Sequence, residues 1–107
     1  MGAKSRRKGA SGELEVAELL RTHGFAARRG QQFSGSPDSP DVVHDIPGVF
    51  IEVKRTESFR LYAAMEQAKT DRKAGDIPAV FHRSNQRPWV VVLDAADFLT
   101  LVKAARP

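Results

Sequence analysis

Two carboxylates and one lysine with the chemistry of a metal site stand close together in the middle of the chain. Asp41 opens a short apolar run, and Glu52 and Lys54 alternate with apolar residues in a second run further on. Hard divalent cations such as Mg²⁺ take carboxylate oxygens together with water and substrate phosphate. A bound cation would acidify a water, and Lys54 could stabilise negative charge beside it. The residue types therefore favour Mg²⁺-dependent phosphodiester chemistry, with Mn²⁺ expected to substitute.

The two runs predict a β-hairpin, because 41–43 and 50–54 flank a break at Pro47-Gly48. Side chains alternate between faces along a strand, so Glu52 and Lys54 point the same way. If the turn centres on the break, Asp41 lies opposite Lys54 and Val43 lies opposite Glu52. The alternative is an exposed edge hairpin protected by its charges. The apolar residues around the charges favour a buried hairpin.

A third carboxylate, Glu13, comes from a helix predicted to begin with Ser11 as its N-cap and to reach about His23. Glu13 shares an apolar stripe with the residues three, four and seven positions later, so we expect it to face inward. A glutamate in a first turn is often only a partner of the helix dipole. The inward position favours a third metal ligand, direct or through water. The backbone carbonyl of Val53 is a further candidate ligand.

The 107-residue chain is interpreted as one domain, residues 10–107, preceded by a basic flexible arm over residues 1–9. The formal net charge is +4 and the pI is near 9.9. Counterion release gives such a domain affinity for nucleic acid, although charge alone is equally consistent with simple solubility. Basic arms are usually mobile until an anion orders them. The arm is either a solvated tail or a phosphate contact, and we favour contact with phosphate through Arg6, Arg7 and Lys8.

Several other classes of site are absent from the sequence. It contains no cysteine, which excludes disulfides, thiolate metal sites and a cysteine nucleophile, and which fits a cytoplasmic protein. No apolar run approaches membrane-spanning length and no signal peptide is apparent, so no membrane partner is expected. The three histidines lack metal-ligand spacing. No glycine-rich phosphate loop is present, so no nucleotide cofactor is expected.

The remaining segments complete the predicted fold. Helices are expected over 61–74 and after an N-cap at Asp94, and strands over 25–29, 78–82 and 89–93. The resulting order is α-β-β-β-α-β-β-α. This order predicts an α/β domain with a small mixed sheet flanked by helices.

These segments together resemble the P-D…(D/E)-x-K nuclease superfamily and, within it, the archaeal-type Holliday junction resolvases. A P-D string with an E-x-K string is weak by itself, whereas an ordered set over roughly residues 6 to 82 is much more specific. The matching segments are Arg7-Lys8-Gly9 with Glu13, Gly24-Phe25-Ala26 leading to Arg29, Ser34-Gly35-Ser36, Pro40-Asp41-Val42-Val43, Ile51-Glu52-Val53-Lys54, and Tyr62 with Glu66-Gln67-Ala68.

The resemblance implies a restriction-endonuclease-like core and a homodimeric, Mg²⁺-dependent endonuclease of DNA recombination and repair. Such an enzyme cuts four-way junctions by paired nicks. Glu13, Asp41 and Glu52 match the metal-binding carboxylates of the family, and Lys54 matches its catalytic lysine.

The resemblance also suggests residues that meet the substrate. Ser34 matches a serine of a loop that acts near the scissile strand, and Arg29 matches an arginine expected to contact DNA. We expect further DNA contacts from Ser36 and Arg55. The chain departs from the family pattern at Leu14, where arginine is frequent, and its C-terminal helix has no clear counterpart.

Two other functions stay open at this point. One is a repair or restriction-type nuclease acting on duplex DNA, against which the chain offers little room for a recognition domain. The other is a non-catalytic DNA-binding protein of the same fold. The intact set of three acids and Lys54 argues against it. In each case the expected compartment is the cytoplasm of a bacterial, archaeal or phage-infected cell.

Overall fold

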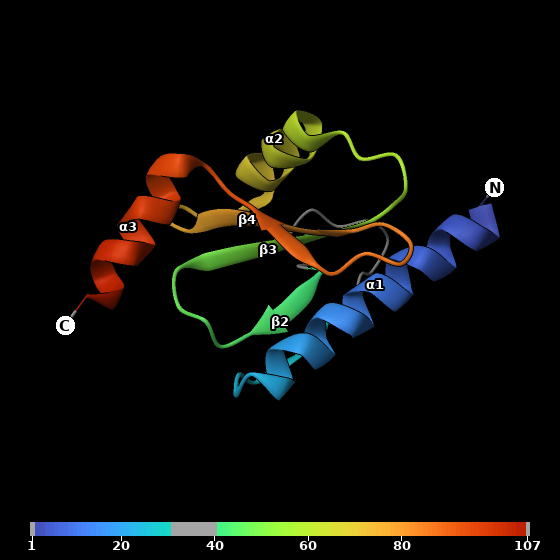
Figure 1. The fold of residues 1–107 in the computed structure, drawn as a ribbon, viewed down its shortest axis with the longest axis horizontal. Coiled ribbons are helices and arrows are strands. Elements are labelled where there is room, and N and C mark those ends of the chain that lie inside the picture. The colour runs from blue at the N-terminus through green and yellow to red at the C-terminus, as the bar shows by residue number, and fades with distance from the viewer. Residues whose placement is uncertain (1, 31–40, 107) are drawn as a thin grey trace.

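Three helices and five strands follow one another in the order α1 β1 β2 β3 α2 β4 β5 α3 in the computed structural model, which describes residues 2–30 and 41–106 and gives side chains from residue 10 onward (Figure 1). The order is the one predicted from the sequence. The bounds are α1 (Gly2–Thr22), β1 (Ala27–Arg29), β2 (Val42–His44), β3 (Val49–Arg55), α2 (Leu61–Asp71), β4 (Ile77–Arg83), β5 (Val90–Val92) and α3 (Ala95–Ala105).

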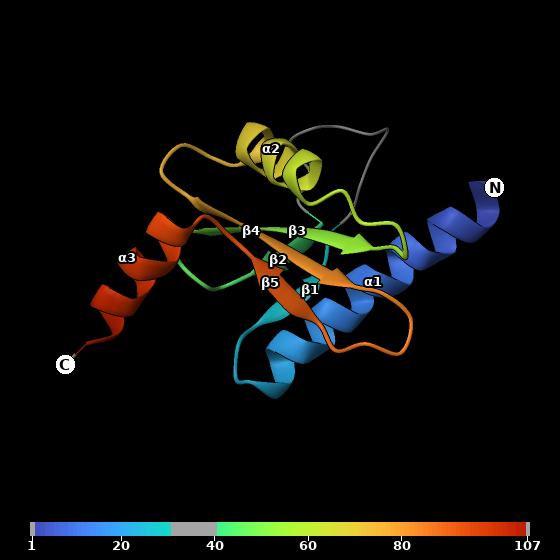
Figure 2. The same cartoon turned by 45° about the horizontal axis from the view of Figure 1, so that its top comes forward.

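The centre of the molecule is a mixed sheet in the strand order β3-β4-β5. Strand β3 runs parallel to β4, and β5 is antiparallel to β4. Parallel neighbours need a crossover connection, which α2 supplies. Helix α2 covers one face of this sheet and α1 lies on the opposite side, with β1 and β2 forming a separate antiparallel pair next to α1 (Figure 2).

Two small cores lie on the two faces of β3. Ile51 and Val53 pack with Val16 and other apolar residues of α1, whereas Phe50 packs against the cluster that α2 forms with Val80. Because side chains alternate along a strand, Glu52 and Lys54 lie on the same face of β3 as Phe50, which is the face toward α2. The predicted common face of the acid and the lysine of β3 is therefore confirmed.

Helix α1 begins at Gly2, so the prediction that Ser11 is its N-cap is wrong. Most of the residues before Ser11 have good or neutral helix propensity, and none is proline. The Ser11 hydroxyl instead donates to a carboxylate oxygen of Glu15 one turn later, at 3.3 Å. The predicted end is close to the observed one, since Gly24 follows the helix with a φ of 92°.

The predicted hairpin does not form as a ladder. Strand β2 pairs with β1, where Arg29 lies opposite Val42, and β3 pairs with β4. The predicted register, with Asp41 opposite Lys54, is therefore wrong. The reason is a contact between the two segments, in which Oδ2 of Asp41 accepts the Val53 N–H at 2.8 Å and so occupies a donor that a β2–β3 ladder would use.

The two C-terminal helices also differ from expectation in detail. Helix α2 ends at Asp71 instead of residue 74, and Asp94 occupies the N-cap position of α3 without a side-chain capping bond. Asp94 instead makes an ion pair of 3.0 Å with Lys69. Helix α3 buries none of its side chains. No helix in the described part of the chain is long and apolar enough to cross a membrane.

Candidate active site

Glu13 and Glu52 are the buried charged residues among the side chains that the structure describes, with 8% and 5% of their surfaces exposed. Charged groups are rarely buried without a partner or a metal. Glu13 comes from α1, Glu52 from β3, and Asp41 from the residue before β2. Three elements therefore bring the three predicted metal-binding carboxylates to one region, where their charges interact.

The pKa values of all three acids are raised by burial. Burial and the charge of Asp41 raise the pKa of Glu52 to about 7, against the lowering effect of Lys54. Burial raises the pKa of Asp41, although its bond to the Val53 N–H lowers it. Burial also raises the pKa of Glu13, which a hydrogen bond from Arg29 lowers and the charge of Asp41 raises. Negative charge is therefore unfavourable here without a cation.

The donor set fits a hard divalent cation. A hydrogen bond between the side chains of Asp41 and Glu52 lowers the pKa of Asp41 and raises that of Glu52, and both acids would have to be ionised to bind a metal ion. Carboxylate oxygens suit Mg²⁺ and Mn²⁺. No group of three potential ligand side chains within the described residues is arranged to hold an ion. Glu13 instead accepts a bond from Arg29 Nε at 2.8 Å.

Lys54 lies between Glu52 and helix α2. Its Nζ atom is 3.7 Å from Oε1 of Glu52 and donates to Oε1 of Gln67 at 2.9 Å. Asp71, one turn after Gln67, raises the pKa values of Asp41 and Glu52 through its charge. Neither α2 residue was assigned a role from the sequence. Their spacing of four, which puts both on one helix face, was the available signal.

Arg29 is half-exposed, with 46% of its side chain accessible beside the buried Glu13. One edge of the guanidinium is bonded to the acid, and almost half of the side chain is open to solvent. An arginine fork offers five donors, so it can hold a carboxylate and a phosphate at once.

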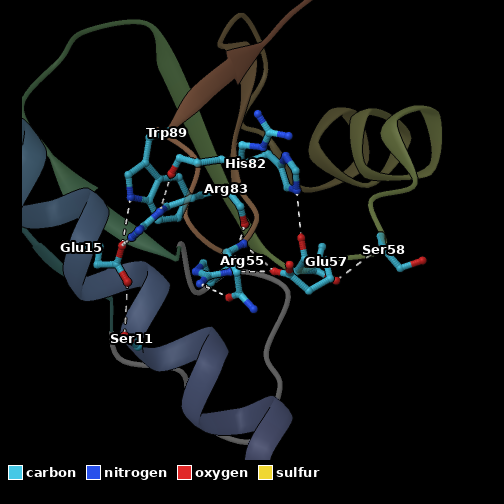
Figure 3. A network of polar contacts seen from close by, with 11 residues as sticks. Ser11, Glu15, Arg55, Glu57, Ser58, His82, Arg83 and Trp89 are labelled. Carbon is cyan, nitrogen blue, oxygen red and sulfur yellow. Dashed lines mark hydrogen bonds and ion pairs between the residues drawn. The ribbon is translucent and has the colours of Figure 1, made fainter.

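Arg55 has a different environment from the one expected of a DNA contact. Only 11% of its side chain is exposed. It donates to Glu57 at 3.2 Å, to the backbone carbonyl of Arg83 at 3.3 Å and to Asn85 at 2.6 Å (Figure 3). Arg55 is therefore less available to a phosphate than Arg29, the other predicted DNA-binding residue whose side chain the structure describes.

A second polar contact ties α1 to the far side of the sheet. Glu15 accepts hydrogen bonds from Arg83 Nη1 and, at 3.1 Å, from Trp89 Nε1 (Figure 3). Glu15 is two residues from Glu13 on the same helix. The contact therefore helps to fix the helix that carries Glu13 relative to the strand that carries Glu52.

The other predicted site residues lie outside what the structure describes. Ser34 and Ser36 belong to the segment 31–40, and the side chains of Arg6, Arg7 and Lys8 precede residue 10.

Comparisons with known proteins point to one family. A family model described as archaeal Holliday junction resolvase (Hjc) matches residues 4–100. The solved structure of Archaeoglobus fulgidus Hjc, a Holliday junction resolvase from an archaeal hyperthermophile, is 28% identical and has a TM-score of 0.58. That similarity covers 80% of this chain and 72% of the Archaeoglobus chain. No curated protein matches this chain. The similarity fits the predicted restriction-endonuclease-like core.

Proposed function

Since this chain belongs to the archaeal Holliday junction resolvase family, and is accordingly a nuclease acting on Holliday junction DNA, we propose that it nicks the junction symmetrically with Mg²⁺ as its cofactor. The observation that carries the proposal is the meeting of buried Glu13 and Glu52 with Asp41. Asp41, whose charge opposes those of two buried glutamates, has little structural use, whereas a divalent cation at the site would stabilise the ionised acids.

In this proposal, Asp41 and Glu52 hold the ion, and Glu13 and the Val53 carbonyl complete its surroundings directly or through water. A bound divalent cation acidifies a water and offsets charge on the scissile phosphate. Lys54 donates to that phosphate or to the attacking water, because its ammonium is already held beside Glu52. The bond from the Val53 N–H keeps Asp41 oriented toward the same strand.

The proposed DNA contacts surround these groups. Arg29 offers the open edge of its guanidinium to a backbone phosphate. The arm residues Arg6, Arg7 and Lys8 and the loop residues Ser34 and Ser36 remain proposed contacts by their resemblance to the family. Contacts to phosphate and sugar carry no base information, so selectivity would come from junction shape. Because the substrate is DNA, we propose that the enzyme works in the cytoplasm.

We further propose that the active form is a homodimer, since twofold symmetry supplies two sites for paired nicks. Helix α3 supports this proposal, because it is amphipathic and exposes Phe98, Leu99 and Val102 to solvent. Val90 and Val91 of the edge strand β5 are also exposed. Helix α3 projects away from the side toward which the N-terminal half of α1 extends (Figure 1). Pairing there would leave the carboxylates open to DNA.

One experiment tests the central proposal. The purified protein is incubated with Mg²⁺ and a four-way junction, a splayed arm or a linear duplex, and the nicks are mapped. We expect symmetric nicks on the junction, and we expect Asp41→Asn and Glu52→Gln to abolish them while junction binding persists. Glu66→Gln, an exposed acid on α2, is the matched control and should cut normally.

The alternatives give different results. Equal cutting of linear duplex would indicate a repair or restriction-type nuclease, and cutting of none of the substrates would indicate a DNA-binding protein. Sedimentation velocity tests the dimer separately. Phe98→Glu should give a monomer, whereas Thr100→Glu, on the opposite face of α3, should not.

A further inference from the structure

A groove of about 320 Å³ lies where the end of β3 meets the beginning of α2. Lys54 lines this groove, so the groove opens beside the candidate active site. It is also lined by Thr56, Ser58 and Phe59 of the connecting segment, and by Arg60 and Gln67. The connection between β3 and α2 lies on the same side of the molecule as the N-terminal half of α1 (Figures 1 and 2).

The charged residues that line this groove are all positive. Lys54 and Arg60 line it, and no acid does. Arg60 is exposed, and within the part of the chain that the structure describes its side chain makes no hydrogen bond or ion pair, although its backbone carbonyl accepts from the N–H of Ala64. The arginines 21, 29, 55 and 83, by contrast, each pair with a glutamate. Arg60 is therefore a cation available to a ligand that carries negative charge.

The rest of the lining is suited to a sugar and to phosphate oxygens. Thr56 and Ser58 supply hydroxyl groups, and Phe59 with the neighbouring alanines supplies an apolar wall. The ring of Phe59 stacks on His82 with centroids 3.9 Å apart and an angle of 8° between planes. The ring of His82 is in turn hydrogen-bonded to the backbone carbonyl of Thr56 at 3.0 Å. These contacts hold the wall in place before any ligand enters.

Lys54 and Arg60 stand at different places in the groove. Lys54 is held toward Glu52 and Gln67, whereas Arg60 directly precedes α2. The amide groups at the start of α2 have no side-chain cap, which adds partial positive charge at the same place. A chain of phosphates fits this arrangement better than a single anion, because two cations are separated by hydroxyl and apolar groups.

We propose that this groove binds the sugar-phosphate backbone next to the scissile phosphate. Lys54 serves the phosphate that is cut, Arg60 binds a neighbouring phosphate through its fork, and the deoxyribose between them lies against Phe59. The proposal rests on the proposed function, since it takes the DNA strand as substrate, and it adds a site that determines how the strand is laid across the carboxylates.

The test measures junction binding over a series of salt concentrations in EDTA, with Arg60→Gln compared with the parent protein. The dissociation constant should rise about 5- to 10-fold, and the salt dependence should lose about one counterion. Arg106→Gln, which removes an exposed arginine at the end of α3, should change neither. Arg60→Lys should restore the salt slope with only part of the affinity, because lysine keeps the charge but lacks the fork.

Two further measurements keep the test decisive. Ser58→Glu puts a negative charge into the same groove and should weaken binding more than Arg60→Gln does. With saturating enzyme and Mg²⁺, Arg60→Gln should lose less in cleavage rate than in affinity, because the carboxylates and Lys54 are untouched. Parent affinity and parent salt slope in both groove variants would overturn the proposal. A parent protein that binds junctions through Arg60 but never cuts would instead overturn the proposed function alone.

Discussion

The ammonium of Lys54 is held between a charged and a neutral acceptor, Glu52 at 3.7 Å and the side-chain carbonyl of Gln67 at 2.9 Å. The shorter contact is to the neutral group. Gln67 therefore orients the ammonium without neutralising it, and the positive charge stays available to a phosphate. A carboxylate in place of Gln67 would compete with the substrate for the same ammonium.

Gln67→Leu keeps a side chain of similar size and removes the acceptor. We expect single-turnover cleavage of a junction to slow by about 3- to 10-fold, because one exposed hydrogen bond that orients Lys54 is lost. Junction affinity should change less than the rate, because Gln67 is a neutral member of the groove lining. The rate is measured by quenched flow or hand sampling with enzyme in excess, and the affinity by anisotropy in EDTA.

A double-mutant cycle decides whether Gln67 acts through Lys54. In a Lys54→Ala background, Gln67→Leu should slow the residual reaction no further. If the two substitutions slow the reaction independently, Gln67 acts on something other than the lysine, and its role as a positioning residue is wrong.

The raised pKa of Glu52 predicts how stability depends on pH. Its folded-state value of about 7 lies above the ordinary 4.5, so folding favours the protonated carboxyl. This contribution is complete below about pH 4.5 and is lost as the pH rises to about 7. Without divalent cations, Glu52→Gln should therefore gain stability relative to the parent between pH 5 and pH 8, by up to about 3 kcal/mol. Urea unfolding in EDTA measures the difference, and exposed Glu66→Gln should show none.

Metal binding reverses the pH preference of the same carboxyl. The ion needs ionised ligands, so its binding releases protons and strengthens as the pH rises toward 7. Cleavage at limiting Mg²⁺ should increase between about pH 6 and pH 8, and excess Mg²⁺ should move the midpoint to lower pH. If the pH at which cleavage is half-maximal does not depend on the Mg²⁺ concentration, these acids do not hold the ion.

Local patterns predicted the elements and the inward-facing acids correctly, because each depends on short spacings. The stripe that contains Glu13 and the alternation at Glu52 and Lys54 are decided by helix and strand geometry within a few residues. The start of α1 differs from the prediction because Ser11 is a favourable N-cap residue, whereas the helix propensity of the residues before it allows α1 to begin at Gly2.

Contacts between distant segments could not be predicted in this way. The pairing of β2 with β1 depends on where the carboxylate of Asp41 finds a donor, which no hairpin pattern encodes. The same holds for Arg55, whose charge suggested DNA binding although Glu57 and Asn85 enclose it. Gln67 carries no charge, and its spacing of four from Asp71 on one face of α2 does not by itself identify it as a partner of Lys54.

Arg29 should influence metal binding as well as DNA binding, because its hydrogen bond lowers the otherwise raised pKa of Glu13. In Arg29→Gln, Glu13 keeps its proton to higher pH. The Mg²⁺ concentration for half-maximal cleavage should therefore rise several-fold in the variant, and by more at the lower of two pH values than at the higher, since raising the pH ionises Glu13.

The neighbouring Arg28→Gln is the matched control for this substitution. Arg28 is exposed, and its guanidinium donates to the backbone carbonyl of Arg29 at 3.5 Å. The Arg28→Gln substitution should leave the Mg²⁺ concentration for half-maximal cleavage unchanged at both pH values. An unchanged requirement in Arg29→Gln, with only junction affinity reduced, would leave Arg29 as a DNA contact and remove its role toward Glu13.

Gly12 sets how closely α1 approaches β3. A Cβ at this position would lie 2.7 Å from the Cβ of Arg55 and 3.4 Å from a methyl carbon of Val53. Alanine normally stabilises a helix interior by about 1 kcal/mol relative to glycine. Here the added carbon would clash with the Cβ of Arg55, which cannot move without its backbone. We therefore expect Gly12→Ala to lower the free energy of unfolding by about 1 to 3 kcal/mol.

The same substitution should also slow cleavage, because moving α1 away from β3 moves Glu13 away from Asp41 and Glu52. Ser11→Ala, at the adjacent exposed position of α1, should be nearly neutral in both urea unfolding and junction cleavage. If Gly12→Ala is as stable as Ser11→Ala and cuts at the parent rate, the helix has room to shift. The close approach of α1 would then not be what positions Glu13.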